Sequence, residues 1–388
     1  MSAVRAGYKQ TEVGVIPEDW EVTTVGQEFS VQLGKMLDSE KNAGMLKPYL
    51  GNRAVQWGKI DISDVGEIKL TSTDLQRFRL RDGDLLVCEG GEIGRAAIWR
   101  QPIQECYFQK ALHRLRPTRG YSSLLMLNIL QQFASTGFLL NFATQTSIAH
   151  LPKDKFEKIP LPLPPTKAEQ IAIAEALSDA DSLIESLEQL LAKKRHLKQG
   201  AMQELLTGKK RLPGFSEEWE VKRLGDVLTI CHGKSQHAVE DRNGCYPILA
   251  TGGRIGTANH YLYDKPSVLI GRKGTIDEPQ YMDTPFWSVD TLFYSTIHEP
   301  NCAKFLFYRF CLIGWKQHNE ASGVPSLNAK TIERIEVAMP RSEEQAAIAA
   351  TLTDIDAEIT ELESQLAKAR ALKQGMMQKL LTGEIRLL

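Results

Sequence analysis

A long internal repeat is the feature that most constrains this chain. The segment from Glu169 to Leu212 returns from Glu344 to Leu387 at a constant offset of 175 residues, and 27 of the 44 paired positions are identical. The copies end in L-K-Q-G-A-M-Q-E-L-L-T-G-K-K-R-L and L-K-Q-G-M-M-Q-K-L-L-T-G-E-I-R-L. A repeat of this length indicates one structural plan used twice.

Each copy is predicted to be a long α-helix with a narrow apolar seam. Its apolar residues step by four and three positions in turn, which is typical of a coiled coil. About 40 residues at 1.5 Å each would give a rod of roughly 60 Å. The predicted seam residues are Ile173, Leu177, Ile184, Leu187 and Leu191 in the first copy and Ile348, Leu352, Ile355, Ile359, Leu362 and Leu366 in the second.

Both ends of each helix carry boundary signals. Thr166 stands three residues before Glu169, and Ser342 stands three before Gln345, which is the spacing of a capping box. The glycines at positions 208 and 383 are expected to end the two helices.

A narrow seam needs a partner, and two arrangements are open. The two copies pack on each other antiparallel, which would relate the halves of the chain by a pseudo-two-fold axis, or each helix packs on its own domain. Gly200 and Gly375 share one repeat position inside the helical pattern, where glycine costs about 1 kcal/mol relative to alanine. This indicates a close backbone approach, a bend or a fraying end.

Composition narrows the class without defining a partner. At 388 residues, two or three domains are expected, and the net charge of -1 requires any nucleic-acid surface to be a local patch or to be shared with basic partners. The six cysteines have no metal-ligand spacing, so reduced thiols in the cytoplasm are expected. The N-terminus has no signal-peptide pattern and no run is long enough to span a membrane.

The repeat extends beyond the helices. P-E-D-W-E-V-T-T-V-G from Pro17 is echoed by S-E-E-W-E-V-K-R-L-G from Ser216, and Gly34-Lys35 by Gly233-Lys234, each at an offset of 199. Short apolar runs between glycine-rich turns predict strand-rich domains. The expected fold is therefore α+β, with two strand-rich domains separated by two long helices packed as an antiparallel coiled coil. The predicted segments are 1–160 (first domain), 161–212 (first helix), 213–337 (second domain) and 338–388 (second helix).

Sequence motifs for catalysis are missing. Gly233-Lys234-Ser235 resembles the end of a phosphate loop, but the position that needs the first glycine holds Leu228. Gly90-Gly91-x-x-Gly94 and Gly252-Gly253-x-x-Gly256 do not fit a dinucleotide fingerprint, and the histidines show no metal-site spacing. An adenine methyltransferase would be expected to carry an N-P-P-Y or D-P-P-Y run, and the sequence has neither. We expect no catalytic residue, no bound metal and no cofactor.

The remaining polar loops interleave basic, amide and aromatic residues, which suits DNA. Arginine can read guanine and glutamine or asparagine can read adenine, while glycine turns let backbone amides approach phosphates. For any single residue, an ordinary solvated loop is the simpler interpretation. The candidate DNA-binding residues are Arg53, Gln56, Trp57, Lys59, Arg77, Gly91, Arg95, Gln109 and Lys110 in the first domain and Arg254, Asn259, His260, Arg272, Lys273, Gln280 and Tyr281 in the second.

Taken together, the chain resembles the specificity subunit of a type I restriction-modification enzyme. The resemblance covers the whole chain and is carried by L-P-L-P-P-x-x-x-E-Q, by the closing K-Q-G-x-M-Q-x-L-L-T-G-x-x-R-L, and by the second copy of each. It implies a non-catalytic subunit that binds double-stranded DNA through two target recognition domains, each reading half of a bipartite asymmetric site. It also implies that the helices set the spacer and dock two methyltransferase subunits, which bind S-adenosylmethionine and methylate adenine. Two restriction subunits would join them for cleavage.

Two other functions remain open from the residues alone. One is a coiled-coil scaffold that does not read DNA, and the other is a stand-alone DNA-modifying enzyme with an unfamiliar site. Methylation by the purified chain alone, or salt-dependent DNA binding by the reconstituted complex, separates these functions.

Overall fold

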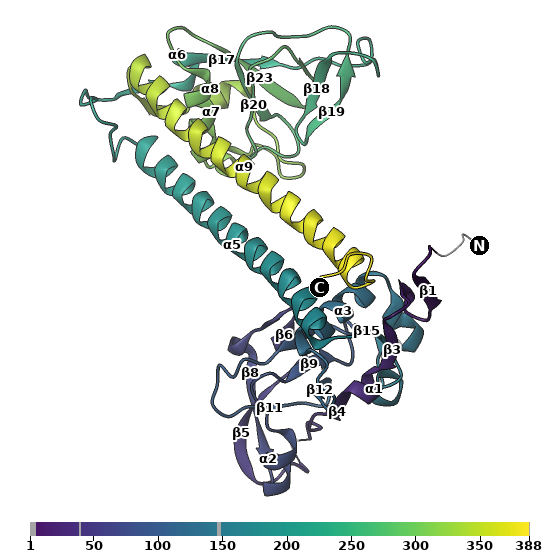
Figure 1. Cartoon of the computed structure of the whole chain (residues 1–388). Helices are drawn as coiled ribbons and strands as arrows, with labels where there is room; N and C mark the ends of the chain where they lie inside the picture. The colour runs from purple at the N-terminus through teal and green to yellow at the C-terminus, as the bar shows by residue number, and fades with distance from the viewer. Residues whose placement is uncertain (1–4, 39, 146–148, 388) are drawn as a thin grey trace. The chain divides into compact units, whose positions relative to one another are not determined.

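The computed structural model describes residues 5–38, 40–145 and 149–387 (Figure 1). The chain divides into two compact units: unit 1 is Met1–Leu187 with Gln365–Leu388, and unit 2 is Glu188–Ser364. The long helices α5 (Lys167–Leu205) and α9 (Ser342–Leu380) each contribute residues to both units.

Unit 1 is built on a four-stranded sheet, in the order β10-β9-β12-β4, and a three-stranded sheet, in the order β11-β5-β8. β9 reads L-L-V-C and all four side chains are buried, so this strand is covered on both faces. β5 and β11 pair parallel, and the other neighbours pair antiparallel. The strands are β4 (Phe29–Leu33), β5 (Met45–Leu50), β8 (Val65–Leu70), β9 (Leu85–Cys88), β10 (Ala96–Ile98), β11 (Tyr107–Phe108) and β12 (Leu112–Pro117).

Unit 2 repeats this plan. Its sheets have the orders β17-β23-β20-β21 and β19-β18-β22, and β18 and β22 form the one parallel pairing among these neighbours in the part of the chain that is described. The buried central strand is β20, which reads S-V-L-I-G. The strands are β17 (Leu228–His232), β18 (Tyr246–Ala250), β19 (Gly253–Ala258), β20 (Ser267–Gly271), β21 (Gln280–Met282), β22 (Trp287–Ser288) and β23 (Leu292–Ile297).

A short antiparallel pair brings the beginning and the end of each globular part together. In unit 1, β3 (Glu21–Thr24) pairs with β15 (Pro160–Leu163), and in unit 2, β16 (Glu220–Arg223) pairs with β24 (Glu336–Met339). Short helices accompany these pairs, and a longer helix covers the core. They are α1 (Val25–Glu28), α3 (Ser123–Ser135) and α4 (Lys153–Phe156) in unit 1, and α6 (Leu224–Val227), α7 (Ala303–Leu312) and α8 (Ala329–Glu333) in unit 2.

Unit 1 carries additional elements, which account for its longer loops. Helix α2 (Ser72–Phe78) begins at Thr71, whose hydroxyl accepts a hydrogen bond from the Asp74 amide while the Asp74 carboxylate accepts one from the Thr71 amide. The hairpins are β1 (Tyr8–Thr11) with β2 (Gly14–Pro17), β6 (Val55–Gln56) with β7 (Lys59–Ile60), and β13 (Thr144–Gln145) with β14 (Ala149–His150). Among the described residues, the 3₁₀ turns are η1 (Asn52–Ala54), η2 (Ile62–Asp64) and η3 (Phe138–Phe142) in unit 1 and η4 (Trp315–His318) in unit 2.

Within each unit, the segments of α5 and α9 contact each other in antiparallel order. In unit 1, Asp181 accepts from Lys373 Nζ at 2.6 Å. In unit 2, Lys198 Nζ lies 2.5 Å from Asp356, and Lys194 pairs with Glu358. All eleven predicted seam residues are buried or half-buried; Ile173 and Leu177 belong to the core of unit 1, and Ile348 and Leu352 to the core of unit 2.

A matching junction fixes the helix ends in each unit. We define the unit 1 junction as Trp20, Glu169 and Arg386, and the unit 2 junction as Trp219, Glu344 and Arg211. The arginine at the end of one repeat binds the buried glutamate at the start of the other, with Arg386 Nη2 2.9 Å from Glu169 Oε2 and Arg211 Nη2 2.6 Å from Glu344 Oε2.

The glutamine after each of these glutamates ties the long helix to the globular part. Gln170 Oε1 accepts from the amide of Ser122 at 3.3 Å, and Gln345 Oε1 accepts from the amide of Cys302 at 2.9 Å. These amides begin α3 and α7. The E-Q pair of the repeat is therefore explained by two different contacts, one to the other repeat and one to the domain.

Two predictions about the helices need correction. Ser342 is already inside α9, and the Gln345 side chain is engaged with Cys302, Asn301 and Pro340, so this pair forms no capping box. At Thr166 the hydroxyl does accept the Glu169 amide, at 3.1 Å. An added Cβ at Gly200 or Gly375 would meet nothing within 4 Å, so neither glycine marks a close backbone approach.

The expected terminators do have left-handed backbone. Gly208 and Gly383 follow α5 and α9 by a few residues with φ of 71° and 67°, which glycine adopts without strain. Both also lie against a tryptophan, Trp219 for Gly208 and Trp20 for Gly383.

Candidate nucleic-acid interface

Four loops of unit 1 are joined by backbone hydrogen bonds. We define the unit 1 loop cluster as residues 34–35, 51–56, 89–95 and 109–111. Its bonds run from Lys35 N to Phe108 O (3.0 Å), Lys110 N to Lys35 O (2.8 Å), Gln109 N to Leu50 O (3.1 Å) and Glu89 N to Ala111 O (2.9 Å). A Cβ at Gly34 would lie 2.3 Å from the Gln109 oxygen, so glycine is required for this approach.

The loops of unit 2 are joined by the same set of backbone hydrogen bonds, which we call the backbone frame. We define the unit 2 loop cluster as residues 233–234, 250–254, 271–276 and 289–291. Lys234 N donates to Ser288 O (2.8 Å), Val289 N to Leu249 O (3.0 Å) and Arg272 N to Thr291 O (2.8 Å). A Cβ at Gly233 would lie 1.9 Å from the Val289 oxygen. The Gly-Lys pair repeated in the sequence is thus the point where one loop crosses another.

These bonds match the two frames residue by residue. Glu89 and Arg272 occupy equivalent positions, because each amide donates to the loop before β12 or β23 and each carbonyl accepts from the segment that follows α3 or α7. The Glu89 carbonyl accepts a hydrogen bond from Leu151 N (2.7 Å), and the Arg272 carbonyl accepts one from Leu327 N (2.9 Å). By the same matching, Gln109 corresponds to Val289 and Lys110 to Asp290.

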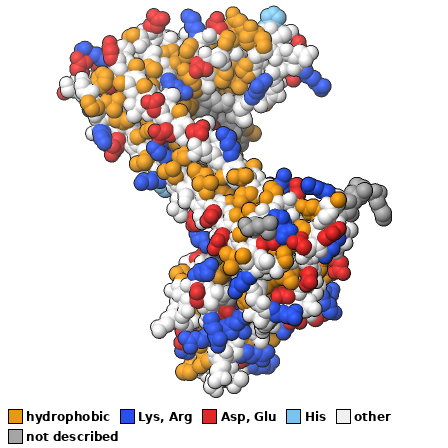
Figure 2. Space-filling model, viewed as in Figure 1, with side chains coloured by type: hydrophobic (Ala, Val, Ile, Leu, Met, Phe, Trp, Pro, Cys, Tyr) orange, Lys and Arg blue, Asp and Glu red, His pale blue; other side chains and the backbone are white. Residues whose placement is uncertain are grey.

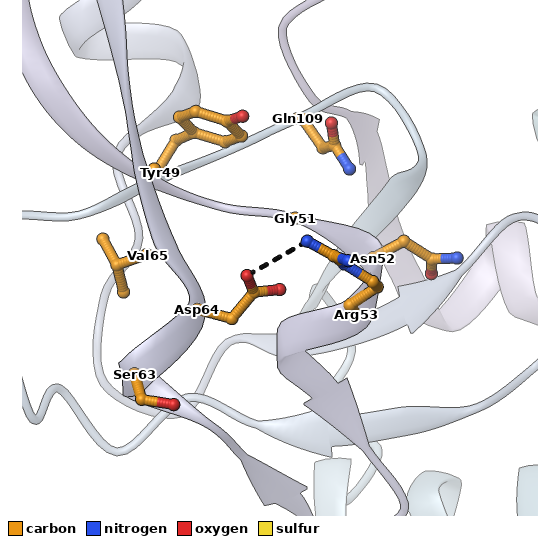
Figure 3. A pocket seen from close by; sticks show the side chains of 9 residues that line it. Tyr49, Gly51, Asn52, Arg53, Ser63, Asp64, Val65 and Gln109 are labelled. Atoms are coloured by element: carbon orange, nitrogen blue, oxygen red, sulfur yellow. Dashed lines mark hydrogen bonds and ion pairs between the residues drawn. The ribbon is translucent and has the colours of Figure 1, made fainter.

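A polar pocket of about 440 Å³ opens beside the unit 1 loop cluster (Figure 3). Figure 3 shows the Arg53 side chain directed at Asp64, with 3.4 Å between Arg53 Nη2 and the Asp64 carboxylate. The Arg53 side chain is 87% exposed, so this pair adds little stability and leaves the guanidinium available. The lining residues are Tyr49, Gly51, Asn52, Arg53, Ser63, Asp64, Val65, Gly66 and Gln109.

Two predicted contact residues donate hydrogen bonds that hold loops in place. Arg95 is mostly buried; its Nη2 donates to Asn52 O at 3.0 Å, and its Nη1 lies 3.4 Å from Glu92. In unit 2, Gln280 Nε2 donates to Ala250 O at 2.9 Å and Thr251 O at 3.2 Å. A charged and a neutral side chain therefore fix the equivalent loop in the two units.

Other predicted residues of unit 1 divide by exposure. Trp57 is half-buried and its indole N–H donates to Glu92 at 2.6 Å, while Gln56 Nε2 donates to Arg53 O at 2.7 Å. Lys59, Gly91 and Lys110 are exposed, and Gly91 has φ of 76°. Gln56 is also exposed, so it and the second group can approach a ligand, whereas Trp57 is half-buried and the edge of its indole is engaged by Glu92.

Arg77 belongs to a basic group that lies outside the unit 1 loop cluster. We call Arg77, Arg79, Arg81, Arg114 and Arg116 the arginine cluster. Arg114 Nη1 donates to the carbonyls of Arg77 (3.0 Å) and Arg79 (3.3 Å), and Arg116 Nε lies 2.6 Å from Asp84. Burial, followed by the charge of Arg116, lowers the pKa of Arg114 to about 10. Figure 2 shows Lys and Arg side chains gathered on the part of unit 1 that carries β5 and α2.

The predicted residues of unit 2 are less concentrated. Arg254, Asn259, His260 and Lys273 are exposed, and His260 Nδ1 lies 2.7 Å from its neighbour's Oδ1. Arg272 is half-buried and donates to Asp290 O at 3.2 Å. Tyr281 lies beneath the ammonium of Lys304, 4.0 Å from the ring centroid, so its face is already covered.

Sequence reasoning missed Glu89, Asn52, Lys35 and Asp290, which the frames bring into the loop clusters. Burial raises the pKa of the Glu89 carboxyl above its ordinary value, although Lys110 and His150 oppose this shift. The repeated Gly-Lys pair was a usable signal for Lys35, but nothing in the local sequence distinguishes Glu89 from a surface acid.

Titratable groups in the core have structural environments. Burial raises the pKa of the Cys88 and Cys106 thiols to about 11 and lowers that of His113 to about 4, and His113 Nε2 lies 2.9 Å from the Leu151 carbonyl. Within residues 5–38, 40–145 and 149–387, no group of three or more His, Cys, Asp or Glu side chains could hold a metal ion. Over the same residues, no helix is long and apolar enough to cross a membrane.

The model of the type I restriction modification DNA specificity domain matches this chain twice, at residues 17–193 and 216–369, so the chain belongs to that family. It is 27% identical to a Methanocaldococcus jannaschii sequence designated type I restriction enzyme MjaX specificity subunit, over 98% of this chain and 96% of that one. The MjaVIII specificity subunit of the same organism is 25% identical, over 96% and 94% of the two chains.

Solved structures agree on the fold. The type I restriction-modification S subunit of M. genitalium superposes with a TM-score of 0.67 at 17% identity, covering 93% of this chain and 96% of the other. A chain from a structure of a type I R-M system complex gives a TM-score of 0.56 at 16% identity, covering 95% and 99%.

Proposed function

We propose that this chain is the DNA sequence-recognition subunit of a type I restriction-modification complex, in which unit 1 and unit 2 each read one half of a bipartite site. The observation that carries the proposal is the duplicated backbone frame. Both loop clusters hold their loops by backbone hydrogen bonds, so the side chains at the matched positions are free to differ. One frame with two sets of side chains is what a reader of two unlike half-sites requires.

The contacts divide into two kinds. Exposed arginine and lysine side chains outside the loop clusters suit phosphates, which position a protein without reading sequence. Exposed polar side chains of the loop clusters suit base edges. Arg53, Lys59, Lys110, Arg254 and Lys273 are available for such contacts, whereas Arg95 and Gln280 already donate hydrogen bonds to loop carbonyls.

For the long helices, we propose one continuous antiparallel coiled coil with a pseudo-two-fold axis, which sets the spacer between half-sites. Support comes from register: the pairs Asp181–Lys373 and Lys198–Asp356, one from each unit, fit a single antiparallel alignment of the repeats. In that alignment, residues 184–190 face 364–370.

The partners follow from this role. We propose that two methyltransferase subunits dock on the helices and supply S-adenosylmethionine and adenine methylation, and that two restriction subunits join for cleavage. This chain would then contribute no catalytic residue. Purified alone, it should not methylate DNA; methylation by the isolated chain would identify it as a stand-alone enzyme.

Domain exchange tests the proposal directly. In the complex with methyltransferase subunits, residues 1–150 are replaced by the equivalent domain of a relative, and methylated adenines are mapped. We expect one half of the recognised sequence to change and the other to persist; the matched exchange of residues 213–337 should do the reverse. A change in both halves from either exchange would contradict modular reading.

Removing residues 184–190 and 364–370 together tests the spacer. The loss of seven residues shortens a helix by about 10.5 Å, close to three base pairs of DNA. We expect the spacer to shorten by about that amount with both half-sites preserved. A scaffold that does not read DNA would instead show no salt-dependent, sequence-selective binding at all.

A further inference from the structure

The two loop clusters carry opposite charges at matched backbone positions. Glu89 in unit 1 and Arg272 in unit 2 have the same pair of backbone hydrogen bonds, one through the amide and one through the carbonyl. Both side chains therefore leave the frame from the same point. Each is half-buried, so each is partly held by its surroundings and partly open to solvent.

A second charge reversal accompanies the first. Lys110 in unit 1 corresponds to Asp290 in unit 2, and both are exposed. The Lys110 ammonium acts on the Glu89 carboxyl, opposing the effect of burial on its pKa. Arg272 Nη1 donates to the backbone carbonyl of Asp290 at 3.2 Å. An acid beside a base in one unit thus becomes a base beside an acid in the other.

These side chains recognise opposite hydrogen-bond patterns. An ionised carboxylate only accepts hydrogen bonds, and a guanidinium only donates them. In the major groove, cytosine presents an amino donor, whereas guanine presents two acceptors that suit a bidentate arginine.

We propose that Glu89 and Arg272 are matched specificity-determining residues, with Glu89 selecting cytosine in the half-site of unit 1 and Arg272 selecting guanine in that of unit 2. This inference rests on the proposed function, which it deepens by assigning base types to two positions.

Selection from a pool of randomised duplexes, by the full chain in complex with methyltransferase subunits, tests it. Glu89→Gln keeps the size of the side chain and removes its charge, so we expect the cytosine preference at one position of one half-site to fall by roughly tenfold, with the other half-site unchanged. Arg272→Gln should lower a guanine preference by a similar factor in the other half-site.

A gain-of-function variant makes the test independent of simple damage. Glu89→Arg with Lys110→Asp gives unit 1 the charge arrangement of unit 2, and we expect a guanine preference where the cytosine preference stood. The matched controls Glu21→Gln and Arg334→Gln change exposed residues of the same types outside the loop clusters, on β3 and after α8. Both should leave the selected sequences unchanged.

The outcomes are distinct. If the unaltered complex selects a bipartite sequence but the Glu89 and Arg272 variants leave every base preference intact, or weaken all positions of both half-sites equally, this inference is wrong and the proposed function stands. If the unaltered complex selects no sequence, the proposed function fails and the inference fails with it.

Discussion

The two loop clusters show how one chain can hold two unlike surfaces on one backbone. Their backbone frames agree down to single hydrogen bonds. Gly34 and Gly233 cross the equivalent loop, at Gln109 and Val289, and the backbone amides of Glu89 and Arg272 donate to equivalent carbonyls. Their side chains disagree in charge. Unit 1 adds the arginine cluster, whereas unit 2 has Ser267 and Tyr294 in place of Asp84 and Arg114. The units therefore share their backbone hydrogen bonds and differ in the charges of their side chains.

The largest effect is expected from substitutions that disrupt the backbone frame shared by the two units. Gly34→Ala and Gly233→Ala each place a Cβ within 2.3 Å of a backbone oxygen, so the crossing loops must separate. We expect each to lower the free energy of unfolding by about 3 kcal/mol, near the upper end for overpacking, and to weaken its own half-site. Denaturant unfolding measures the first and duplex selection the second.

Gly252→Ala is the control for these variants, because its Cβ would meet nothing within 4 Å and its φ is not positive. Equal destabilisation by Gly252→Ala and Gly233→Ala would contradict the close-approach argument.

The junctions give the next largest effect. Arg386→Met removes the partner of the buried Glu169 and of Asp19, so we expect the free energy of unfolding to fall by roughly 2 kcal/mol, below the range for fully buried pairs because the Arg386 side chain is 24% exposed. Arg211→Met breaks a single ion pair, the one with Glu344, so we expect a smaller decrease in the free energy of unfolding. Calorimetry on both variants compares them, and the reverse order would show that Asp19 adds nothing.

A smaller effect is expected at the Lys35–Asp74 ion pair of unit 1. Although desolvation raises it, the pKa of Asp74 is held below its ordinary 3.8, because Lys35 and Thr71 donate to the carboxylate. A lowered pKa stabilises the fold above the unfolded value and stops doing so as pH falls through the folded value. We expect Asp74→Asn to cost about 1 kcal/mol near neutral pH and nothing near pH 2.

Urea unfolding at both pH values measures this. Lys234 is the counterpart of Lys35 and is exposed; Lys234→Met is the control and should be neutral at either pH. A pH-independent cost for Asp74→Asn would assign its role to helix capping rather than charge.

The smallest effect concerns the arginine cluster. Arg77→Ala or Arg79→Ala should reduce the salt dependence of DNA binding by about one phosphate contact each, with no change in base preference. Between 50 and 200 mM salt, this corresponds to roughly a threefold smaller loss of affinity. A changed base preference would move these residues into the reading surface.

The sequence predicts the helices well because their information is local. The repeated seam, the positive-φ glycines 208 and 383, and the E-Q pairs all stand at one offset of 175. The second capping box was wrong because Gln345 is used by a contact with Cys302, which no local pattern records. Gly200 and Gly375 lie in open space, so their shared position reflects no packing constraint in this structure.

The candidate interface is less predictable because its equivalences pass through insertions. The offset between the units is 199 at Gly34 but 183 at Glu89, so alignment by spacing cannot match Glu89 with Arg272. Only the backbone hydrogen bonds do. Likewise, the sequence does not reveal that Arg95 and Gln280, which remain predicted DNA contacts, donate hydrogen bonds to carbonyl groups of the equivalent loop.

The closure of both frames by main-chain atoms has a practical consequence for engineering. Since amides and carbonyls, which every residue other than proline supplies, hold the crossing loops together, positions 89, 110, 272 and 290 can be randomised with little cost to folding. A library confined to these four codons would search recognition variants while sparing the architecture. Retargeting would then be a problem of side-chain choice alone.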